Sequence, residues 1–228
     1  MATSTVEDYL KCIFLEQQKL PAERVTTGRI ASALRVAPGT ATAMVKTLDQ
    51  SGLVSYEPYS GVRLTDSGRQ LAAHVLRRHR LVELFLVRIL GLDWSEVHAE
   101  AEDLEHVVSD RVLERMDEML GHPSVDPHGD PIPDARGVLE EPERISLVAC
   151  PTGRPLRVVR VDDQSAEFLR LVERRGLMPG SRLRVESRDA AADTVELVRV
   201  ESADDEVVVN LGWRAASKIF VAPASAAD

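Results

Sequence analysis

The side chains best suited to chemistry lie in one nine-residue segment, HAEAEDLEH, which runs from His98 to His106. An α-helix advances about 100° per residue, so a helix here gathers both histidines and two glutamates within roughly one third of its circumference. These residues are His98, Glu102, Glu105 and His106. Apolar residues interleave with them, which predicts that this polar face lies beside a core. Because buried imidazoles and carboxylates need a compensating positive charge, the segment predicts a divalent metal site.

A second segment offers the same types of donor. His79 and Glu83 in RRHRLVELF are four residues apart, so they share one face of a helix. Two adjacent helices that each carry a histidine and a carboxylate can form a mixed nitrogen and oxygen site for a divalent transition metal. The alternative is an ion-pair network in which neighbouring arginines neutralise the carboxylates. These arginines are Arg77, Arg78 and Arg80.

The donor atoms favour particular metals. HAEAEDLEH contains no cysteine, so it offers carboxylate oxygen and imidazole nitrogen, which suit Mn(II) or Fe(II), whereas thiolates favour zinc or copper. The two cysteines of the chain, Cys12 and Cys150, are too few and too far apart for a disulfide framework or a zinc ribbon. This cysteine usage is typical of a reducing cytoplasm.

Composition limits the class of protein. The chain has 228 residues, of which 44% are hydrophobic and 29% charged, as expected for a globular protein with one large domain or two to three small ones. The first residues, MATSTVEDYL, lack the features of a signal peptide, and no apolar run approaches membrane-spanning length. We therefore expect a cytoplasmic protein that has no membrane partner.

The net charge of −9 is distributed unevenly. Residues 1–70 contain eight Lys or Arg and seven Asp or Glu, which gives +1, and the remainder contains 20 against 30, which gives −10. A near-neutral head on an acidic body is compatible with nucleic-acid binding through a local basic face. Charge alone does not decide the function.

The order of elements near the N-terminus is that of a winged helix-turn-helix. Helices are expected over residues 4–18, 26–34 and 40–51, followed by two short strands around residues 59–61. Small residues at the start of the third helix permit close approach to base edges. No Arg, Asn or Gln that could hydrogen-bond to bases stands there, so we expect the DNA sequence to be recognised through thymine methyl groups and DNA shape. The residues expected to contact DNA are Arg29, Pro38, Gly39, Thr40, Thr42, Lys46 and Arg63. The alternative is a winged helix that serves only for packing.

The rest of the chain predicts a helical body followed by a β domain. A long helix is expected from residue 65 to about residue 91, and Asp93 or Ser95 caps a second helix that carries HAEAEDLEH to about residue 110. A further helical segment ends at Gly121, and residues 122–136 hold four prolines, which predicts a constrained loop. From residue 155, five short strands and one helix predict a small barrel. The expected domains are residues 1–72, 73–136 and 155–223, with a linker over residues 137–154.

Several segments together resemble the diphtheria toxin repressor and manganese transport regulator family of metal-dependent transcriptional repressors, in its three-domain form. They are VEDYLKCIF, RIASALRVAPGTATAMVKTLDQSGLV, LTDSGRQLA, RRHRLVELFL, ILGLD, EDLEHVVSD and HGDPIP. The resemblance implies an α+β fold with an N-terminal winged helix-turn-helix, a helical metal-binding and dimerisation domain, and a C-terminal SH3-like, FeoA-type β-barrel. It also implies a homodimer that binds a pseudo-palindromic operator in double-stranded DNA.

The same resemblance implies two metal sites per subunit. The first would use Asp8, Glu102, Glu105 and His106, and the second His79, Glu83 and His98. In three-domain members the SH3-like domain can add ligands, for which Asp163 and Gln164 are the candidates, although an ordinary polar turn is the alternative there.

Two positions bear on the identity of the metal. Iron-type members of the family carry Met and Cys where this chain has Asp8 and Glu102, so the oxygen donors favour manganese, with Fe(II) as the alternative. Short manganese regulators carry Glu one turn after the aspartate, where Lys11 stands here. This difference argues against a closely spaced pair of manganese ions. Cys12 is expected to be a buried core thiol.

The resulting hypothesis is a manganese-activated repressor of metal-uptake genes, in which metal pins the DNA-binding head against the body. An iron(II)-responsive repressor of the same family is the alternative. A metal-dependent enzyme has less support, because no nucleophile elbow, phosphate loop or general-base motif accompanies the ligands. A winged-helix sensor of a small organic ligand would need an apolar pocket in the β domain, and no small organic substrate is expected.

Overall fold

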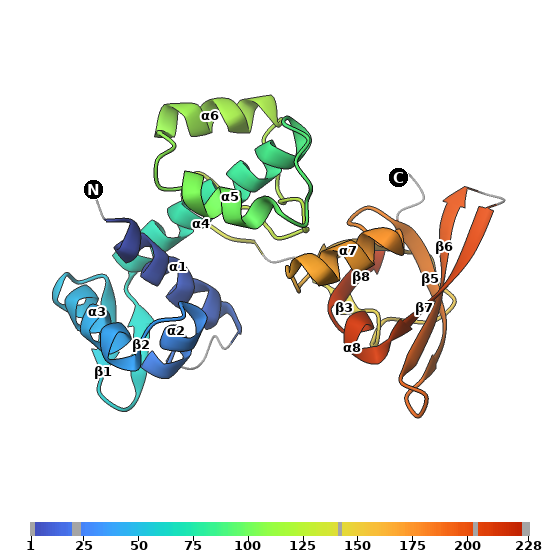
Figure 1. Ribbon diagram of the computed structural model, residues 1–228, viewed down its shortest axis with the longest axis horizontal. Coiled ribbons are helices and arrows are strands. Elements are labelled where there is room, and N and C mark those ends of the chain that lie inside the picture. Colours follow the sequence, from blue (N-terminus) through green and yellow to red (C-terminus); the bar gives the residue numbers. More distant parts are fainter. Residues whose placement is uncertain (1–2, 20–23, 141–142, 203–204, 225–228) are drawn as a thin grey trace.

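The structure is a computed structural model that describes residues 3–19, 24–140, 143–202 and 205–224. Three parts follow one another along the chain: a mixed head, a helical body and a β domain (Figure 1). The α+β fold class predicted from the sequence is confirmed. Among the described residues, no helix combines the length and the apolarity that crossing a membrane would require.

The head is a winged helix-turn-helix. Its elements are α1 (Ser4–Lys19), α2 (Thr27–Ala33), α3 (Pro38–Gln50), β1 (Val54–Glu57) and β2 (Gly61–Leu64). The hydroxyl of Thr26 caps α2 by accepting from the backbone N–H of Arg29. β1 and β2 pair in antiparallel register, from Val54 opposite Leu64 to Glu57 opposite Gly61. Apolar residues of α1, α2 and α3 form the core, among them Leu10, Ile13, Phe14, Ile30, Val45 and Leu48.

The third helix of the head is longer than its sequence predicts. It begins at Pro38 and not at residue 40, because proline lacks an N–H and its fixed φ suits the first helical position. Pro38 and Gly39 therefore form the exposed N-terminal turn of α3.

The body consists of α4 (Asp66–Arg88), α5 (Val97–Leu104) and α6 (Asp110–Met119). The expectation of one helix from residue 95 to residue 110 is wrong, because α5 ends at Leu104 and His106 lies in the turn after it. Ser109 is the N-cap of α6 and has extended backbone angles, so no helix can run through it. Neither Asp93 nor Ser95 caps α5, since the Asp93 carboxylate accepts from the N–H of Ser95 in the preceding turn.

The β domain is built on one antiparallel sheet. Its elements are β3 (Ile145–Ser146), β4 (Leu156–Val161), α7 (Ala166–Arg174), β5 (Arg182–Asp189), β6 (Thr194–Ser202), β7 (Asp205–Gly212), α8 (Trp213–Ala216) and β8 (Ile219–Pro223). The strand order is β3-β8-β4-β5-β6-β7. The segment around residues 145–150, expected to be linker, instead adds β3 and buries Leu147 and Cys150 in the domain core.

The β domain is docked on the body. Trp94, from the connection between α4 and α5, is buried in the core of the β domain, and its ring stacks on His128. Gly129 has φ of +86°, and a Cβ there would lie 1.9 Å from the carbonyl oxygen of Val159. Asp130 pairs with Arg160 at 2.7 Å. The loop over residues 122–136 thus connects the helices of the body to the sheet. Where this loop comes closest to β4, at Val159, only glycine fits.

Candidate metal centre

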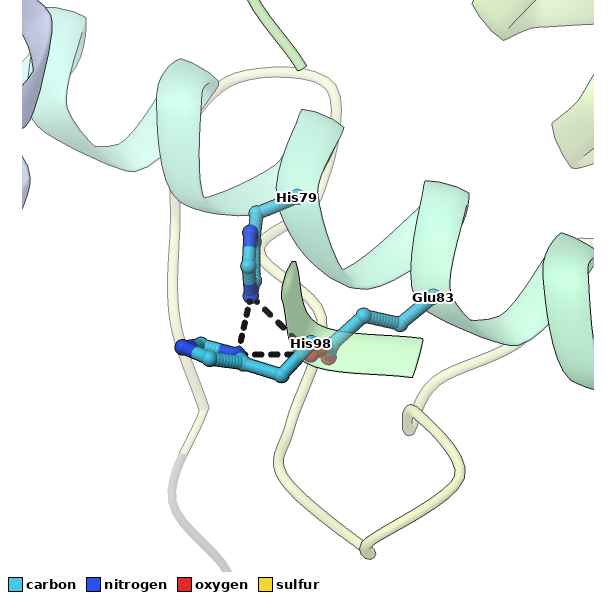
Figure 2. A group of neighbouring side chains, drawn as sticks. All are labelled: His79, Glu83 and His98. Atoms are coloured by element: carbon cyan, nitrogen blue, oxygen red, sulfur yellow. Dashed lines mark hydrogen bonds and ion pairs between the residues drawn. The ribbon is translucent and has the colours of Figure 1, made fainter. Parts of the chain in front are cut away.

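Three donor residues meet between α4 and α5. His79 and Glu83 project from successive turns of α4, and His98 reaches them from α5 (Figure 2). Nε2 of His79 lies 3.0 Å from Oε1 of Glu83 and 3.2 Å from Nδ1 of His98. His98 Nδ1 lies 3.0 Å from the same Glu83 oxygen. We refer to these three residues as the inner group.

The inner group is buried on the α4 side and charged. His79 and Glu83 are buried, whereas half of the His98 side chain is exposed. Burial alone would lower the pKa of His79, but the negative charge of Glu83 and hydrogen bonds to Glu105 and Glu83 raise it to about 9. Burial alone would raise the pKa of Glu83, yet the charge of His79 and the imidazole hydrogen bonds hold it well below its usual range. The Glu83 carboxylate and the His79 imidazole therefore favour each other's charged forms.

A second set of donors joins the head to the body. Nε2 of His106 lies 2.9 Å from Oδ1 of Asp8 on α1 and 3.4 Å from Oε1 of Glu105. Nδ1 of the same ring lies 2.8 Å from Oε2 of Glu7. We refer to Asp8, Glu105 and His106 as the bridging group. Its members come from two parts of the fold, so any ion bound there contacts both.

Glu102 lies at the edge of the bridging group. Its carboxylate accepts from Lys11 Nζ at 2.8 Å and stands 3.8 Å from Nδ1 of His79. Burial alone would lower the pKa of Lys11, but the charges of Glu105 and Glu102 raise it. The sequence-predicted ligands on α1, α4 and α5 are thus brought together in one polar region, with a lysine among them.

A third set includes two residues that sequence reasoning missed. Asp126 and His128 are buried in the loop after α6, and each offers an atom within 4.8 Å of the other and of Glu83. His128 Nε2 donates to the carbonyl oxygen of Trp94 at 2.9 Å, which leaves Nδ1 as an acceptor facing Glu83 at 4.0 Å. The signal for His128 was the motif HGDPIP, which begins with this histidine but whose prolines and glycine indicate a constrained loop. Glu7, next to Asp8 in the sequence, was also missed.

The chemistry of these sets fits a divalent ion. Within the described residues, His128 Nδ1 and Asp126 Oδ2 are buried atoms that lack a hydrogen-bond partner, and buried polar atoms require one. Burial and the charges of Asp130 and Glu83 raise the pKa of Asp126 well above its usual value. A cation would relieve this repulsion. All sets found among the described residues combine imidazole and carboxylate, with no cysteine.

The two candidates from the β domain have different surroundings. Gln164 lines a pocket of about 360 Å³ together with His79, Glu83 and His98, and its Nε2 donates to Asp130 Oδ2 at 2.7 Å. The carboxylate of Asp163 instead pairs with Lys218 and accepts from the N–H of Ser165. Their role as metal ligands stays a prediction, and only Gln164 is placed beside the inner group.

The residues expected to contact DNA lie on the head. Pro38, Gly39, Thr40 and Lys46 are exposed on α3. Thr42 is half-buried, and its hydroxyl donates to the carbonyl oxygen of Pro38 at 2.9 Å. Arg29 on α2 pairs with Glu16, and Arg63 is half-buried on β2. Their contacts with DNA stay predictions.

The fold defines a class of protein, the metal-dependent DNA-binding regulators. It combines a winged helix-turn-helix head, a body that brings metal-donor side chains together and an SH3-like β domain. Comparison with known families supports this at each part of the chain. Residues 1–62 match the iron dependent repressor N-terminal DNA binding domain, residues 65–134 its metal binding and dimerisation domain, and residues 145–223 the FeoA domain.

Individual relatives cover most of the chain. The iron-dependent repressor IdeR of Mycobacterium bovis is 34% identical over 204 residues, which is 84% of this chain and 87% of that protein. A manganese-dependent transcriptional repressor in complex with manganese has a TM-score of 0.85 and 42% identity, covering 96% of this chain and 100% of that one. The structure of ScaR with bound Cd2+ has a TM-score of 0.75 and 33% identity, covering 96% and 99%.

The chain belongs to the iron-dependent repressor family, as its resemblance to the diphtheria toxin repressor predicted. It is a metal-dependent transcriptional repressor and not an enzyme. Double-stranded DNA and a second copy of the chain are its partners. The domain boundaries predicted from the sequence, and the assignment of individual ligands, stay predictions.

Proposed function

We propose that this protein is a manganese-responsive repressor of metal-uptake genes, and that two metal sites per subunit control it. The observation that carries the proposal is the bridging group, because it combines carboxylates and imidazole from the head and the body. Asp8 and Glu102 present oxygen, and no cysteine joins any donor set among the described residues. Such sets suit Mn(II) and Fe(II). The relative described with bound manganese, at 42% identity, supports manganese.

The bridging group links metal binding to DNA binding. Asp8 lies on α1, which packs in the head core with α3, whereas Glu105 and His106 follow α5 of the body. A divalent ion would supply positive charge that neutralises the carboxylates of Asp8 and Glu105. Once this repulsion is removed, α1 stays in contact with the body. The distance between the two α3 helices of a dimer is then fixed. DNA then binds without the cost of ordering the head.

The second site is centred on Glu83. This carboxylate belongs both to the inner group and to the set with Asp126 and His128. Gln164 faces the same pocket from the β domain. Glu83 is therefore the residue on which the second site depends, whichever imidazoles complete it.

The dimer surface is proposed to lie on the body. Large apolar side chains remain exposed on and beside α4, α5 and α6, where they would be buried by a second copy. They are Ile89, Leu90, Val107, Val112 and Met119.

The experiment that tests the metal assignment compares Mn(II) and Fe(II) side by side in anaerobic buffer. The full-length protein is titrated into a fluorescent DNA duplex selected by the same protein from a random-sequence pool. We expect Mn(II) to support binding of this duplex. DNA binding supported by Fe(II) but not by Mn(II) would favour the iron-responsive alternative, which the similarity to IdeR also allows.

A further inference from the structure

Tyr59 lies in the turn between β1 and β2, with its whole side chain exposed. Its relative exposure is 106%, so within the described part of the chain nothing covers the ring. Tyrosine is ordinarily half-buried in folded proteins, because its ring is a large apolar surface with one polar tip. The ring of Tyr59 contributes no packing to the head and is accessible to a partner.

The backbone at Tyr59 is unfavourable for this residue type. Its φ is +68°, in the left-handed region, and the N–H of Ser60 donates to the carbonyl oxygen of Glu57 at 3.1 Å. Pro58 precedes it, which gives the turn the type II pattern, and the third position of that turn favours glycine or asparagine. A bulky side chain at positive φ is uncommon and strained. Glycine would suit the fold better here, which points to a role of the ring outside the fold.

The β1–β2 hairpin extends from the head beside α3 (Figure 1) and is held on both sides. Val25, before α2, exchanges backbone hydrogen bonds of 2.8 and 2.9 Å with Val62 on β2. The two chains approach so closely that a Cβ at Gly61 would lie 2.6 Å from the carbonyl oxygen of Val25. On the other side, the N–H of Tyr56 donates to the carboxylate of Asp49, near the end of α3, at 2.9 Å. The turn therefore keeps a fixed position relative to α3.

The charges of the hairpin are compatible with DNA. Arg24 donates to the carbonyl oxygen of Ser55 at 2.7 Å and pairs with Glu57, so the acidic residue beside the turn has its charge compensated. The turn itself, residues 58–60, carries no charged side chain. A contact made by this turn would add affinity for DNA without the counterion release that a lysine or arginine contact causes.

We infer that Tyr59 is a DNA-contacting residue, whose ring packs on the sugars of the minor groove beside the major groove that α3 is expected to enter. Base pairs present similar atoms in the minor groove, so the contact adds affinity with little sequence preference. The strained backbone at Tyr59 is retained because the ring serves DNA binding. The inference requires that the chain binds double-stranded DNA, and it does not depend on which metal activates the protein.

The test compares Tyr59→Gly with the unsubstituted full-length protein on the selected duplex, with whichever of Mn(II) and Fe(II) supports binding. We expect the dissociation constant to rise about tenfold. The slope of its logarithm against the logarithm of salt concentration should not change, because tyrosine is uncharged. The midpoint of thermal unfolding should not fall, because glycine adopts this φ without strain. The matched control is Asp193→Gly, at an exposed position of the β domain with φ of +54°, which should stay within about twofold in DNA affinity.

Hydroxyl-radical footprinting at saturating protein locates the contact, because these radicals attack the sugars. Tyr59→Gly is expected to lose protection at one short cluster of sugars in each half-site and to keep the rest of the footprint. An affinity within about twofold of the unsubstituted protein, or a footprint without a local change, would overturn the inference. A loss of affinity together with a lower midpoint of unfolding would assign the effect to the fold and overturn it too.

Discussion

Oε2 of Glu105 lies 2.5 Å from Nδ1 of His79, which connects the bridging group to the inner group through one buried carboxylate. The other oxygen of Glu105 accepts from Lys11. Residues of α1, α4 and the end of α5 therefore form one polar network, in which a change at one group alters the charges felt by the other. Two metal sites built on this network would not be independent.

Substituting Glu105 should weaken metal binding at both groups. We expect Glu105→Gln to weaken both Mn(II) binding events by at least about tenfold, because the amide loses the charge that both sets of donors share. Asp8→Asn is the matched variant, since Asp8 contacts His106 and not His79, and it should weaken one event far more than the other. Calorimetric titration with Mn(II) resolves the two events, and equal behaviour of the two variants would contradict the shared network.

Glu7 should position His106 without binding metal. Its carboxylate accepts from Nδ1 of His106, which leaves Nε2 directed at Asp8. Residues that hydrogen-bond to a metal ligand in this way contribute about 10- to 100-fold to metal affinity. Glu7→Gln should therefore weaken Mn(II) binding by about 10- to 100-fold. The control is Glu100→Gln, which changes an exposed carboxylate on α5. A Glu7→Gln protein that matches this control in a Mn(II) titration would exclude the positioning role.

Two of the three histidines near Glu83, His98 and His128, can be tested separately by substitution. His98→Ala removes a half-exposed imidazole, and His128→Ala removes a buried one that also holds the carbonyl of Trp94. If the inner group is the second site, His98→Ala abolishes the second Mn(II) binding event and His128→Ala retains it. The reverse result would move the second site to the set with Asp126. Thermal unfolding in EDTA checks that both variants fold.

Sulfur donors should change the metal preference of the bridging group. The double variant Asp8→Met with Glu102→Cys replaces two hard oxygen donors by softer sulfur. We expect its affinity for Mn(II) to fall by at least about tenfold and its preference to move towards Fe(II) and Zn(II). Anaerobic competition titrations measure both affinities. A double variant that keeps the unsubstituted order of metals would show that these two positions do not select the metal.

Gly129 should be essential for docking of the β domain. A Cβ at this position meets the carbonyl oxygen of Val159 at 1.9 Å, and φ is +86°. Gly129→Ala should therefore lower the free energy of unfolding by more than about 2 kcal/mol and alter the fluorescence of Trp94. Gly153→Ala is the matched control, because Gly153 has φ of +68° and open space around it, so it measures backbone strain alone, about 1 kcal/mol. Equal losses in chemical denaturation would mean that the close contact is unimportant.

Local spacing correctly predicted that two of the candidate ligands share one face of a helix. His79 and Glu83 are one turn apart on α4, and helix geometry alone places them on one face. The same reasoning predicted too long a helix for α5, because the amphipathic pattern continues through His106. The helix ends at Leu104, and Ser109 caps the next one. His106 still reaches Asp8, but it does so from a turn.

Long-range contacts explain what the sequence could not predict. Lys11 is separated from Glu105 by 94 residues, and their pairing depends on how α1 lies against the body, which no local pattern encodes. His128 lies in a loop whose path depends on the docking of Trp94 and Gly129 on the β domain. Side chains on loops take their role from such tertiary contacts.

The central claim is that metal held between Asp8 on the head and Glu105 and His106 on the body controls DNA binding. The most direct test is the dissociation constant for the selected DNA duplex, measured with saturating Mn(II) and with EDTA, in the unsubstituted protein and in Asp8→Asn. The account predicts that Mn(II) tightens DNA binding by about 10- to 100-fold in the unsubstituted protein and hardly at all in the variant. Equal affinity with Mn(II) and with EDTA in the unsubstituted protein would contradict it.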